Sequence, residues 1–289
     1  MEGSAMGAPA AIANAMTVDV EDYFQVQALS GVIARADWDA IACRVEDNVA
    51  RLLDRFAAAD VRGTFFTLGW IAERHPAMVR RIVAAGHELA SHGYDHIRVD
   101  RLDPASFAAD IARTKTLLEQ IGGVAVTGYR APTFSINRRN PWAFTVLAEQ
   151  GYRYSSSVYP IRHDLYGMPE APRAPFRPDG GALWEIPMTT IRVLGRNLPC
   201  AGGGYFRLLP YRLFRLGLAR LNGSERRAGI FYIHPWEIDA AQPRVTGLSR
   251  RARFRHYVNL AKTAGRLERL LGDFAWDRMD RVFAAQLAA

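Results

Sequence analysis

The sequence predicts an α/β fold of parallel strands, because strand and helix segments alternate along most of its 289 residues. Short apolar runs typical of buried strands recur between longer segments in which apolar residues repeat with helical spacing. The length suits one large domain, and α/β barrels of this size commonly fold as one unit. Hydrophobic residues make up 49% of the chain and charged residues 23%, so a sizeable core is expected. The alternation alone leaves the sheet either closed into a barrel or open.

Element boundaries follow from apolar runs, helical periodicity and terminating glycines. An apolar run predicts the first strand at residues 15–20, and the helix expected over 45–59 carries four apolar residues on one face. Glycines close the strand expected at 63–69 and end the helices expected at 77–85 and 104–121. The remaining elements expected in this half are strands at 87–91, 125–129 and 152–158 and a helix at 141–150.

The alternation lapses between residues 161 and 204, where proline and glycine are dense. We expect a long insertion near the mouth of a barrel here, with one strand at 183–187 and another around 190–194. Regular elements then resume, with a buried strand at 229–233 and helices at 210–221 and 254–272. The expected parts of the chain are a disordered leader (1–15), one barrel domain (16–275, including the insertion) and a helical tail (276–289).

The sequence predicts neither a membrane anchor nor an export signal. The leader ends in an Ala-x-Ala pattern but lacks the charged and strongly apolar regions of a signal peptide. No run approaches the roughly 20 apolar residues that a membrane helix needs. A cytoplasmic location is therefore expected, whereas the oligomeric state is left open. Cys43 and Cys200 are far apart, match no metal or redox motif, and are expected to be buried free thiols.

The chain carries a formal net charge of +8, and a basic balance can signal a nucleic-acid partner. Arginine is instead spread along the whole sequence, with only short clusters such as Arg250-Arg251-Ala252-Arg253. The sequence has neither a long basic run nor an aromatic-interleaved motif of the nucleic-acid modules. No nucleic-acid partner is therefore expected.

Polar side chains that could carry chemistry follow four of the expected strands. In a parallel α/β barrel the carboxyl ends of the strands form one face, which is the active-site face. Residues at these ends are therefore expected to be neighbours in space, although they are distant in sequence. They are Asp19, Glu21 and Asp22 after the first strand, then His92 with His96, Arg130, and His234.

His92 and His96 are the strongest candidates for metal ligands. In a helix, residues i and i+4 lie on one face, and a neutral imidazole is a common ligand of zinc and similar ions. Strand parity puts Asp19 and Glu21 on one face and Asp22 on the other, unless the strand has ended; such acids can also cap a following helix. Two histidines and one carboxylate would leave positions open for water and substrate, as in catalytic metal sites.

The combination resembles the polysaccharide deacetylases of the NodB-homology type, carbohydrate esterase family 4. The resemblance extends from Met16 to Phe274, nearly the whole chain. Its motifs are Thr17-Val-Asp-Val-Glu-Asp22, Gly86-His-Glu-Leu-Ala-Ser-His-Gly-Tyr-Asp-His96, Arg130-Ala-Pro132 and Ile233-His234. A narrower likeness, to the branch tied to bacterial exopolysaccharide gene clusters of the exosortase/PEP-CTERM type, rests on segments 18–24, 202–207, 232–237 and 255–260.

The resemblance implies a distorted (β/α) barrel with seven or eight parallel strands and an insertion at its mouth. It implies a metal-dependent hydrolase that removes acetyl groups, N-acetyl above all, from amino sugars of a bacterial polysaccharide or oligosaccharide. The implied setting is exopolysaccharide biosynthesis. The ion would be Zn2+, or else Co2+, Ni2+ or Mn2+.

The resemblance also implies a role for each candidate residue. It makes Asp19 the general base, Arg130 the partner that holds this base ionised, and His234 the general acid. The carboxylate bound to the ion would be Glu21 by parity, with Asp22 as its rival. The other implied contacts are His92 and His96 to the ion, and Tyr94, Pro132 and Trp236 to the sugar.

Two departures from the family pattern keep an alternative function open. Val20 separates two acids that are adjacent in the family's commonest form, and Gly93 stands where Ser or Thr is usual. The alternative is a catalytically degraded barrel that binds glycan during polysaccharide assembly. Non-haem iron oxygenases use the same ligand types, but their double-stranded β-helix does not fit the strand–helix alternation.

Overall fold

The computed structural model describes residues 12–288, and its central feature is an eight-stranded sheet. Neighbouring strands of this sheet pair in parallel, and the sheet curves into a half-barrel. The strand β10 (Trp276–Asp277) pairs with Asn14 and Ala15, at the start of β1. The other seven strands follow one another across the sheet. Their order is β9 (Ile230–Ile233), β1 (Asn14–Val20), β2 (Thr64–Thr67), β3 (Glu88–Ser91), β4 (Gly128–Tyr129), β5 (Tyr154–Ser155) and β6 (Trp184–Glu185).

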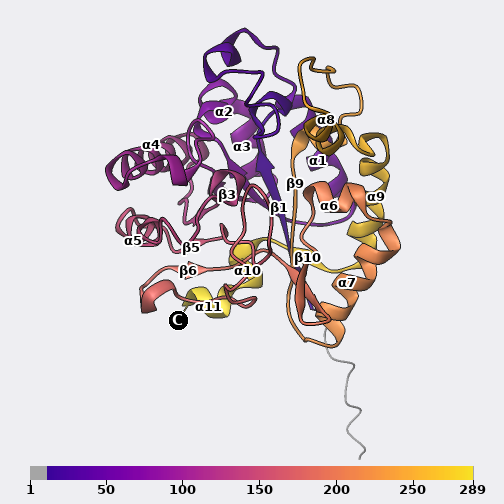
Figure 1. The fold of residues 1–289 in the computed structure, drawn as a ribbon. Coiled ribbons are helices and arrows are strands. Elements are labelled where there is room, and N and C mark those ends of the chain that lie inside the picture. The colour runs from indigo at the N-terminus through magenta and orange to yellow at the C-terminus, as the bar shows by residue number, and fades with distance from the viewer. Residues whose placement is uncertain (1–11, 289) are drawn as a thin grey trace, which may run out of the picture.

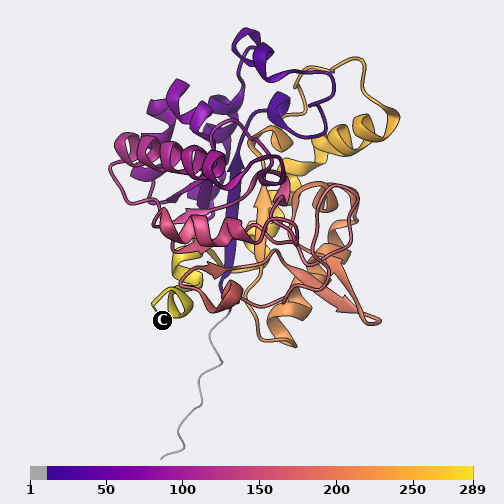
Figure 2. The ribbon, with the colours of Figure 1, turned by 60° about the vertical axis from the view of Figure 1, so that its left-hand side comes forward.

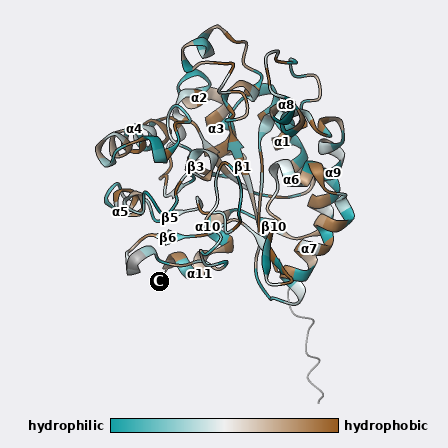
Figure 3. Cartoon of the chain, viewed as in Figure 1, coloured by the Kyte–Doolittle hydropathy of each residue, from teal (hydrophilic) through white to brown (hydrophobic). Residues whose placement is uncertain are grey.

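The helices of the described residues surround this sheet. They are α1 (Val45–Ala58), α2 (Gly69–Arg74), α3 (Pro76–Ala84), α4 (Pro104–Gly122), α5 (Trp142–Glu149), α6 (Gly203–Leu208), α7 (Tyr211–Gly223), α8 (Arg250–Tyr257), α9 (Leu260–Asp273), α10 (Met279–Val282) and α11 (Ala284–Ala288). Figure 1 shows α4 and α5 on one flank of the strands and α7 and α9 on the other. Coloured by hydropathy, α7 and α9 carry hydrophobic stretches beside hydrophilic ones, as expected of helices with one buried face (Figure 3).

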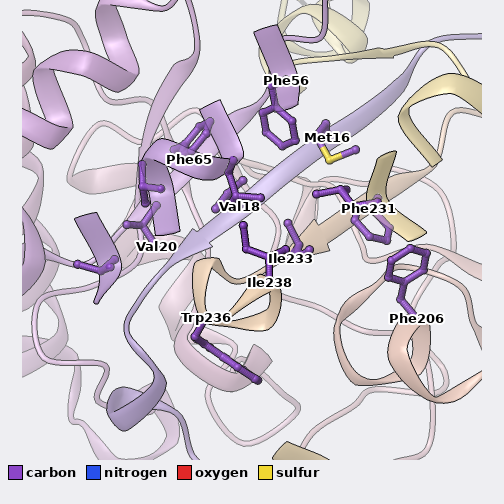
Figure 4. Packing of buried hydrophobic residues seen from close by; sticks show 14 of the residues in the cluster. Met16, Val18, Val20, Phe56, Phe65, Phe206, Phe231, Ile233, Trp236 and Ile238 are labelled. Atoms are coloured by element: carbon purple, nitrogen blue, oxygen red, sulfur yellow. The ribbon is translucent and has the colours of Figure 1, made fainter. Parts of the chain in front are cut away.

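Strand β1 is buried along its whole length because strands pair with both of its edges. Met16 and Val18 point to the helical side, where they join Phe56 of α1 in the largest apolar cluster (Figure 4). Burying one such aromatic side chain contributes about 1.5–3 kcal/mol, so the cluster fixes which way the strand faces. Because side chains alternate along a strand, Thr17 and Asp19 point to the opposite side, into the half-barrel.

Most predicted elements are present, with boundaries shifted by a few residues. The strand expected at 15–20 begins at Asn14, and the earlier part of the predicted leader, through residue 11, lies outside the described residues. The strand expected at 183–187 is β6, which belongs to the main sheet. The strand expected around 190–194 is β7 (Thr190–Val193), and it forms an antiparallel hairpin with an unpredicted strand, β8 (Arg196–Pro199).

The C-terminal part differs from the prediction in two places. The single helix expected over 254–272 is two helices, α8 and α9, because Asn259 between them has a left-handed φ of 53°. The predicted helical tail opens with a strand, β10, whose two residues pair with Asn14 and Ala15. A strand of two residues carries too little periodicity to be recognised from sequence.

Within residues 12–288, the helices all lack the combination of length and hydropathy that crossing a bilayer requires. Both cysteines are free thiols, as predicted. Cys200 is buried, and burial raises the pKa of its thiol to about 12, whereas Cys43 is partly exposed.

Candidate metal and catalytic site

Four strands of the half-barrel deliver polar side chains to a common end. Asp19 is the penultimate residue of β1, and His92, Arg130 and His234 come directly after β3, β4 and β9. Because these strands are parallel, their carboxyl ends lie on the same side of the sheet. A cavity of about 150 Å³ at this end is lined by the polar residues Asp19, Glu21, His92, His96 and His234.

Glu21, His92 and His96 form a group that could hold a metal ion, because one ligand atom of each lies within 4.8 Å of the others. Glu21 Oε2 is 2.9 Å from His96 Nε2, yet this buried oxygen has no hydrogen-bond partner among the described residues. The carbonyl oxygen of Arg130 is 2.8 Å from His92 Nδ1, so Nδ1–H donates to it and Nε2 is left for an ion. Two imidazoles and one carboxylate are a donor set that fits zinc and similar ions.

The two histidines do not share a helix, so helical i, i+4 spacing is not what brings them together. Strand β3 ends at Ser91, and the chain continues as a loop in which Gly93 and His96 have left-handed φ values of 75° and 55°. A Cβ atom at Gly93 would lie 3.1 Å from Asp110 Oδ2. The Asp110 carboxylate accepts a hydrogen bond of 3.2 Å from the backbone N–H of Tyr94. Glycine and this carboxylate together shape the loop that carries both imidazoles.

The structure places Asp22 outside the metal-binding group. Its carboxylate caps the short 3-10 turn that follows β1 and accepts a hydrogen bond of 2.7 Å from the Tyr23 N–H. It also accepts bonds of 2.5 and 2.9 Å from the N–H groups of Arg44 and Val45, at the start of α1. All of these bonds go to backbone, so Asp22 has the capping role that such acids can take, and Glu21 is the acid that faces the histidines.

Asp19 and Arg130 form an ion pair inside the half-barrel. Asp19 Oδ1 is 2.6 Å from Arg130 Nη1, which is also 2.8 Å from Thr17 Oγ1. Arg130 is fully buried, and its guanidinium lies 4.1 Å from the centre of the Phe66 ring. A second hydrogen bond, of 3.2 Å, runs from Arg130 Nε to the Ser156 carbonyl. These contacts hold a fixed positive charge beside Asp19, whose other oxygen is 4.0 Å from His234 Nε2.

His234 is held between two carboxylates. Its Nε2 atom is 3.0 Å from Glu21 Oε1, and its Nδ1 atom is 2.6 Å from Glu237 Oε1. Burial opposes protonation of His234, but Glu21 and Glu237 outweigh burial and raise its pKa to about 9. Burial likewise opposes ionisation of Glu237, but Arg207, with Nε 2.5 Å away, and His234 lower its pKa to about 2. The ring is therefore oriented with Nε2 toward the cavity.

The three residues predicted to contact sugar differ in position. Trp236 lines the cavity and stacks between His234 and His256, with ring centroids 5.3 and 4.4 Å apart. Tyr94 does not line it: the hydroxyl donates a hydrogen bond of 2.5 Å to Glu73 on the α2 side. Pro132 is buried, and the cavity is lined by its neighbours in the chain instead. Trp236 is thus the one of the three that the structure brings to the cavity.

Sequence reasoning missed two kinds of residue at this site. Glu237 was not selected as a site residue. A 3-10 turn at Pro235–Ile238 brings its side chain back to the His234 imidazole, so its position three residues after His234 was a usable signal. Tyr166 and Phe134 also line the cavity and contact each other edge to face. Tyr166 lies in the insertion, where the sequence offered no regular pattern.

Two protein-family models match parts of the chain. Residues 37–155 match the family model described as polysaccharide deacetylase. This stretch of the chain is thus similar to the polysaccharide deacetylases. Residues 156–284 match a second model, described as a domain of unknown function (DUF3473).

Curated relatives are also named as deacetylases. A peptidoglycan-N-acetylglucosamine deacetylase of Bacillus cereus is 32% identical over 82 residues, which are 28% of this chain and 30% of the relative. A chitin deacetylase of Pestalotiopsis sp is 32% identical over 106 residues, covering 36% of this chain and 35% of the relative. The chain thus spans about a third of the length of these curated relatives.

Solved structures confirm the predicted fold class. A Mycobacterium smegmatis protein described as a candidate polysaccharide deacetylase superposes with a TM-score of 0.62 at 22% identity, covering 98% of this chain and 93% of the other. Puue allantoinase superposes with a TM-score of 0.60 at 18% identity, covering 98% and 95%. Proteins with these two different names share the fold, so the reaction has to be argued from the site.

Proposed function

We propose that this chain is a metal-dependent hydrolase that removes N-acetyl groups from amino sugars of a bacterial polysaccharide during exopolysaccharide biosynthesis. The observation that carries the proposal is one cavity in which Glu21, His92 and His96 converge beside Asp19 and His234. Relatives named for acetyl removal from peptidoglycan and chitin support the reaction type. The exopolysaccharide setting rests on the exosortase/PEP-CTERM-type motifs of the sequence.

Each residue of the cavity then has a defined task. A divalent ion, foremost Zn2+, held by Glu21, His92 and His96 would supply Lewis acidity to the acetyl carbonyl and to a water. Asp19 accepts the proton of the attacking water, and the buried Arg130 guanidinium, 2.6 Å away, orients this carboxylate.

His234 completes the reaction as general acid. Its Nδ1 is held by Glu237, so Nε2 faces the cavity and donates a proton to the departing amine. The C–N bond breaks as the carbonyl carbon gains the water oxygen, and the products are acetate and the free amino sugar. Trp236 keeps the imidazole in this plane by stacking on it.

Acetate release tests the proposal directly. The purified chain is incubated with N-acetylated chito-oligosaccharides and Zn2+ or Co2+, alongside Asp19→Asn and a charge-matched control, Asp54→Asn, on the exposed side of α1. Wild type and Asp54→Asn should release acetate, whereas Asp19→Asn should lose roughly 100-fold or more in kcat.

A different outcome would favour the alternative function. Tight binding of the oligosaccharides without acetate release by the wild type or either variant would identify a glycan-binding barrel. Equal acetate release by the wild type and Asp19→Asn would show that Asp19 is not the base.

A further inference from the structure

A second cavity has a volume of about 950 Å³ and is lined by several arginines. Residues of the segment 161–173 line both this cavity and the catalytic cavity. The second cavity has a single acidic lining residue, Glu170, which pairs with Arg138. We call this cavity the arginine groove. Its five arginines are Arg162, Arg173, Arg192, Arg196 and Arg227.

The charge of the arginine groove is only partly neutralised. Arg173 and Arg227 share Glu225, at 2.9 and 3.6 Å. Arg162, Arg192 and Arg196 form no ion pair with any side chain in the part of the chain that the structure describes. A hollow with three uncompensated positive charges attracts anions, because its walls concentrate the field.

The hairpin of β7 and β8 holds two of these arginines in place. Arg192 lies on β7 and Arg196 on β8, next to a tight turn in which Leu194 and Gly195 have φ values of 48° and 76°. A hydrogen bond of 2.9 Å from Asn197 Nδ2 to the Pro160 carbonyl ties the hairpin to the segment that follows β5. In Figure 2 the hairpin projects at the lower right of the molecule. The two guanidinium groups are therefore carried by a short, anchored element.

The arginine groove and the catalytic cavity are each adjacent to a third cavity, with which each shares lining residues. Leu165 and Tyr166 line both the catalytic cavity and a middle cavity of about 410 Å³. Pro169 and Glu170 line both that middle cavity and the arginine groove. A polymer whose acetylated sugar enters the catalytic cavity can therefore continue into the arginine groove.

We propose that the arginine groove binds anionic groups of the same glycan chain whose acetylated sugar occupies the catalytic cavity. The inference rests on the proposed function and narrows the substrate to a polyanionic, acetylated polysaccharide. Guanidinium groups bind the paired oxygens of carboxylates and of phosphates in the same bidentate way, so the anionic group is a uronate carboxylate or a phosphate ester.

The test compares three kinds of acetylated oligosaccharide of equal length. One alternates N-acetylglucosamine with glucuronate, the second is its carboxyl-reduced neutral form, and the third is a phosphorylated chito-oligosaccharide. The variant is Arg192→Gln/Arg196→Gln, and the control is Arg80→Gln/Arg81→Gln, which removes the same charge from exposed positions of α3. For anionic oligosaccharides the hairpin variant should lose roughly tenfold or more in kcat/KM, through KM, since the loss of even one charged hydrogen bond costs about tenfold.

The neutral oligosaccharide should be turned over equally by the wild type and both variants. Equal KM values of the wild type and the hairpin variant for the anionic substrates, or an equal loss for neutral and anionic ones, would overturn the inference and leave the deacetylase proposal standing. Whichever anionic oligosaccharide shows the larger loss identifies carboxylate or phosphate as the natural group.

Binding measured by calorimetry separates this inference from the proposed function. If no oligosaccharide releases acetate but the hairpin variant binds the anionic ones roughly tenfold more weakly than the control does, the groove is upheld and the deacetylase proposal fails. If neither anionic oligosaccharide binds to the wild type, the inference about the arginine groove is overturned.

Discussion

At the scale of single residues, His234 and Glu237 show how one carboxylate sets both the orientation and the charge of the proposed acid. The bond of 2.6 Å from His234 Nδ1 fixes the ring, and Glu21 with Glu237 raises the pKa of His234 to about 9 against the effect of burial. As an acid, His234 is active when protonated, so activity is kept below this pKa and lost as the pH rises through it.

Glu237→Gln should therefore shift the pH dependence of the reaction. The amide keeps the shape of the side chain but removes a negative neighbour, which lowers the pKa of His234 and moves the alkaline loss of activity to lower pH. We expect kcat to fall roughly 10- to 100-fold, because the ring is held less well. A pH–rate profile checks both effects, with Glu149→Gln on the exposed side of α5 as control. An alkaline limb that stays in place would contradict this role for Glu237.

The residues that could be predicted from the sequence lie at the carboxyl ends of strands or directly after them. Asp19, His92, Arg130 and His234 could be predicted to converge because parallel strands end on one side of a sheet. Glu237 and Tyr94 could not be assigned in this way, since the direction of each side chain depends on the backbone after the strand has ended. A 3-10 turn brings Glu237 back to the site, and the loop after β3 turns Tyr94 toward Glu73.

At the scale of elements, the loop after β3 depends on glycine. Gly93 has a φ of 75°, and a Cβ atom there would lie 3.1 Å from a carboxylate oxygen of Asp110. Gly93→Ala should lower the free energy of unfolding by about 1–2 kcal/mol, the cost of a left-handed conformation for a residue with a Cβ. Because the same loop carries His92 and His96, metal affinity should also fall, by roughly tenfold or more.

A matched control for this loop is Gly123→Ala. Gly123 ends α4 with a similar φ of 65°, but a Cβ atom there has no neighbour within 4 Å among the described residues. Gly123→Ala should lower the free energy of unfolding by a comparable amount and leave the metal affinity unchanged. Urea unfolding and titration with Zn2+ measure the two quantities. Equal loss of metal affinity in both variants would show that Gly93 acts through global stability.

The elements that the sequence did not predict share a physical origin. Strands β8 and β10 are short, and β10 exists only because it pairs with β1 from the other end of the chain. The apolar periodicity of the sequence predicted α8 and α9 as one helix, whereas the break between them depends on the left-handed backbone conformation of Asn259. Long-range pairing and a single left-handed residue leave little trace in local periodicity.

At the scale of the whole molecule, the catalytic cavity draws on both family regions. His92 and His96 lie within residues 37–155, whereas His234 and Trp236 lie within residues 156–284. Hydrogen bonds of 2.9 Å from Met188 to Val158 and 2.7 Å from Tyr232 to Ala201 tie the insertion to the segment after β5 and to the edge strand β9. The region matched as a domain of unknown function thus supplies the proposed general acid and also the arginine groove.

Metal binding should accordingly stabilise the molecule as a whole. The proposed ligands come from the end of β1 and from the loop after β3, so an ion would bind the folded chain and not the unfolded one. At a Zn2+ concentration 100-fold above Kd, the free energy of unfolding should rise by about 2.7 kcal/mol, and a chelator should reverse the rise. Calorimetric unfolding with and without Zn2+ measures it.

Two neighbouring substitutions decide which acid binds the ion. Glu21→Gln removes the carboxylate that faces His96 and should abolish most of the Zn2+-dependent rise. Asp22→Asn removes the same charge one residue later, where the side chain accepts hydrogen bonds from three backbone N–H groups. It should lower the stability of the metal-free protein by about 1 kcal/mol and keep the rise. A rise that survives Glu21→Gln and disappears in Asp22→Asn would assign the carboxylate ligand to Asp22 instead.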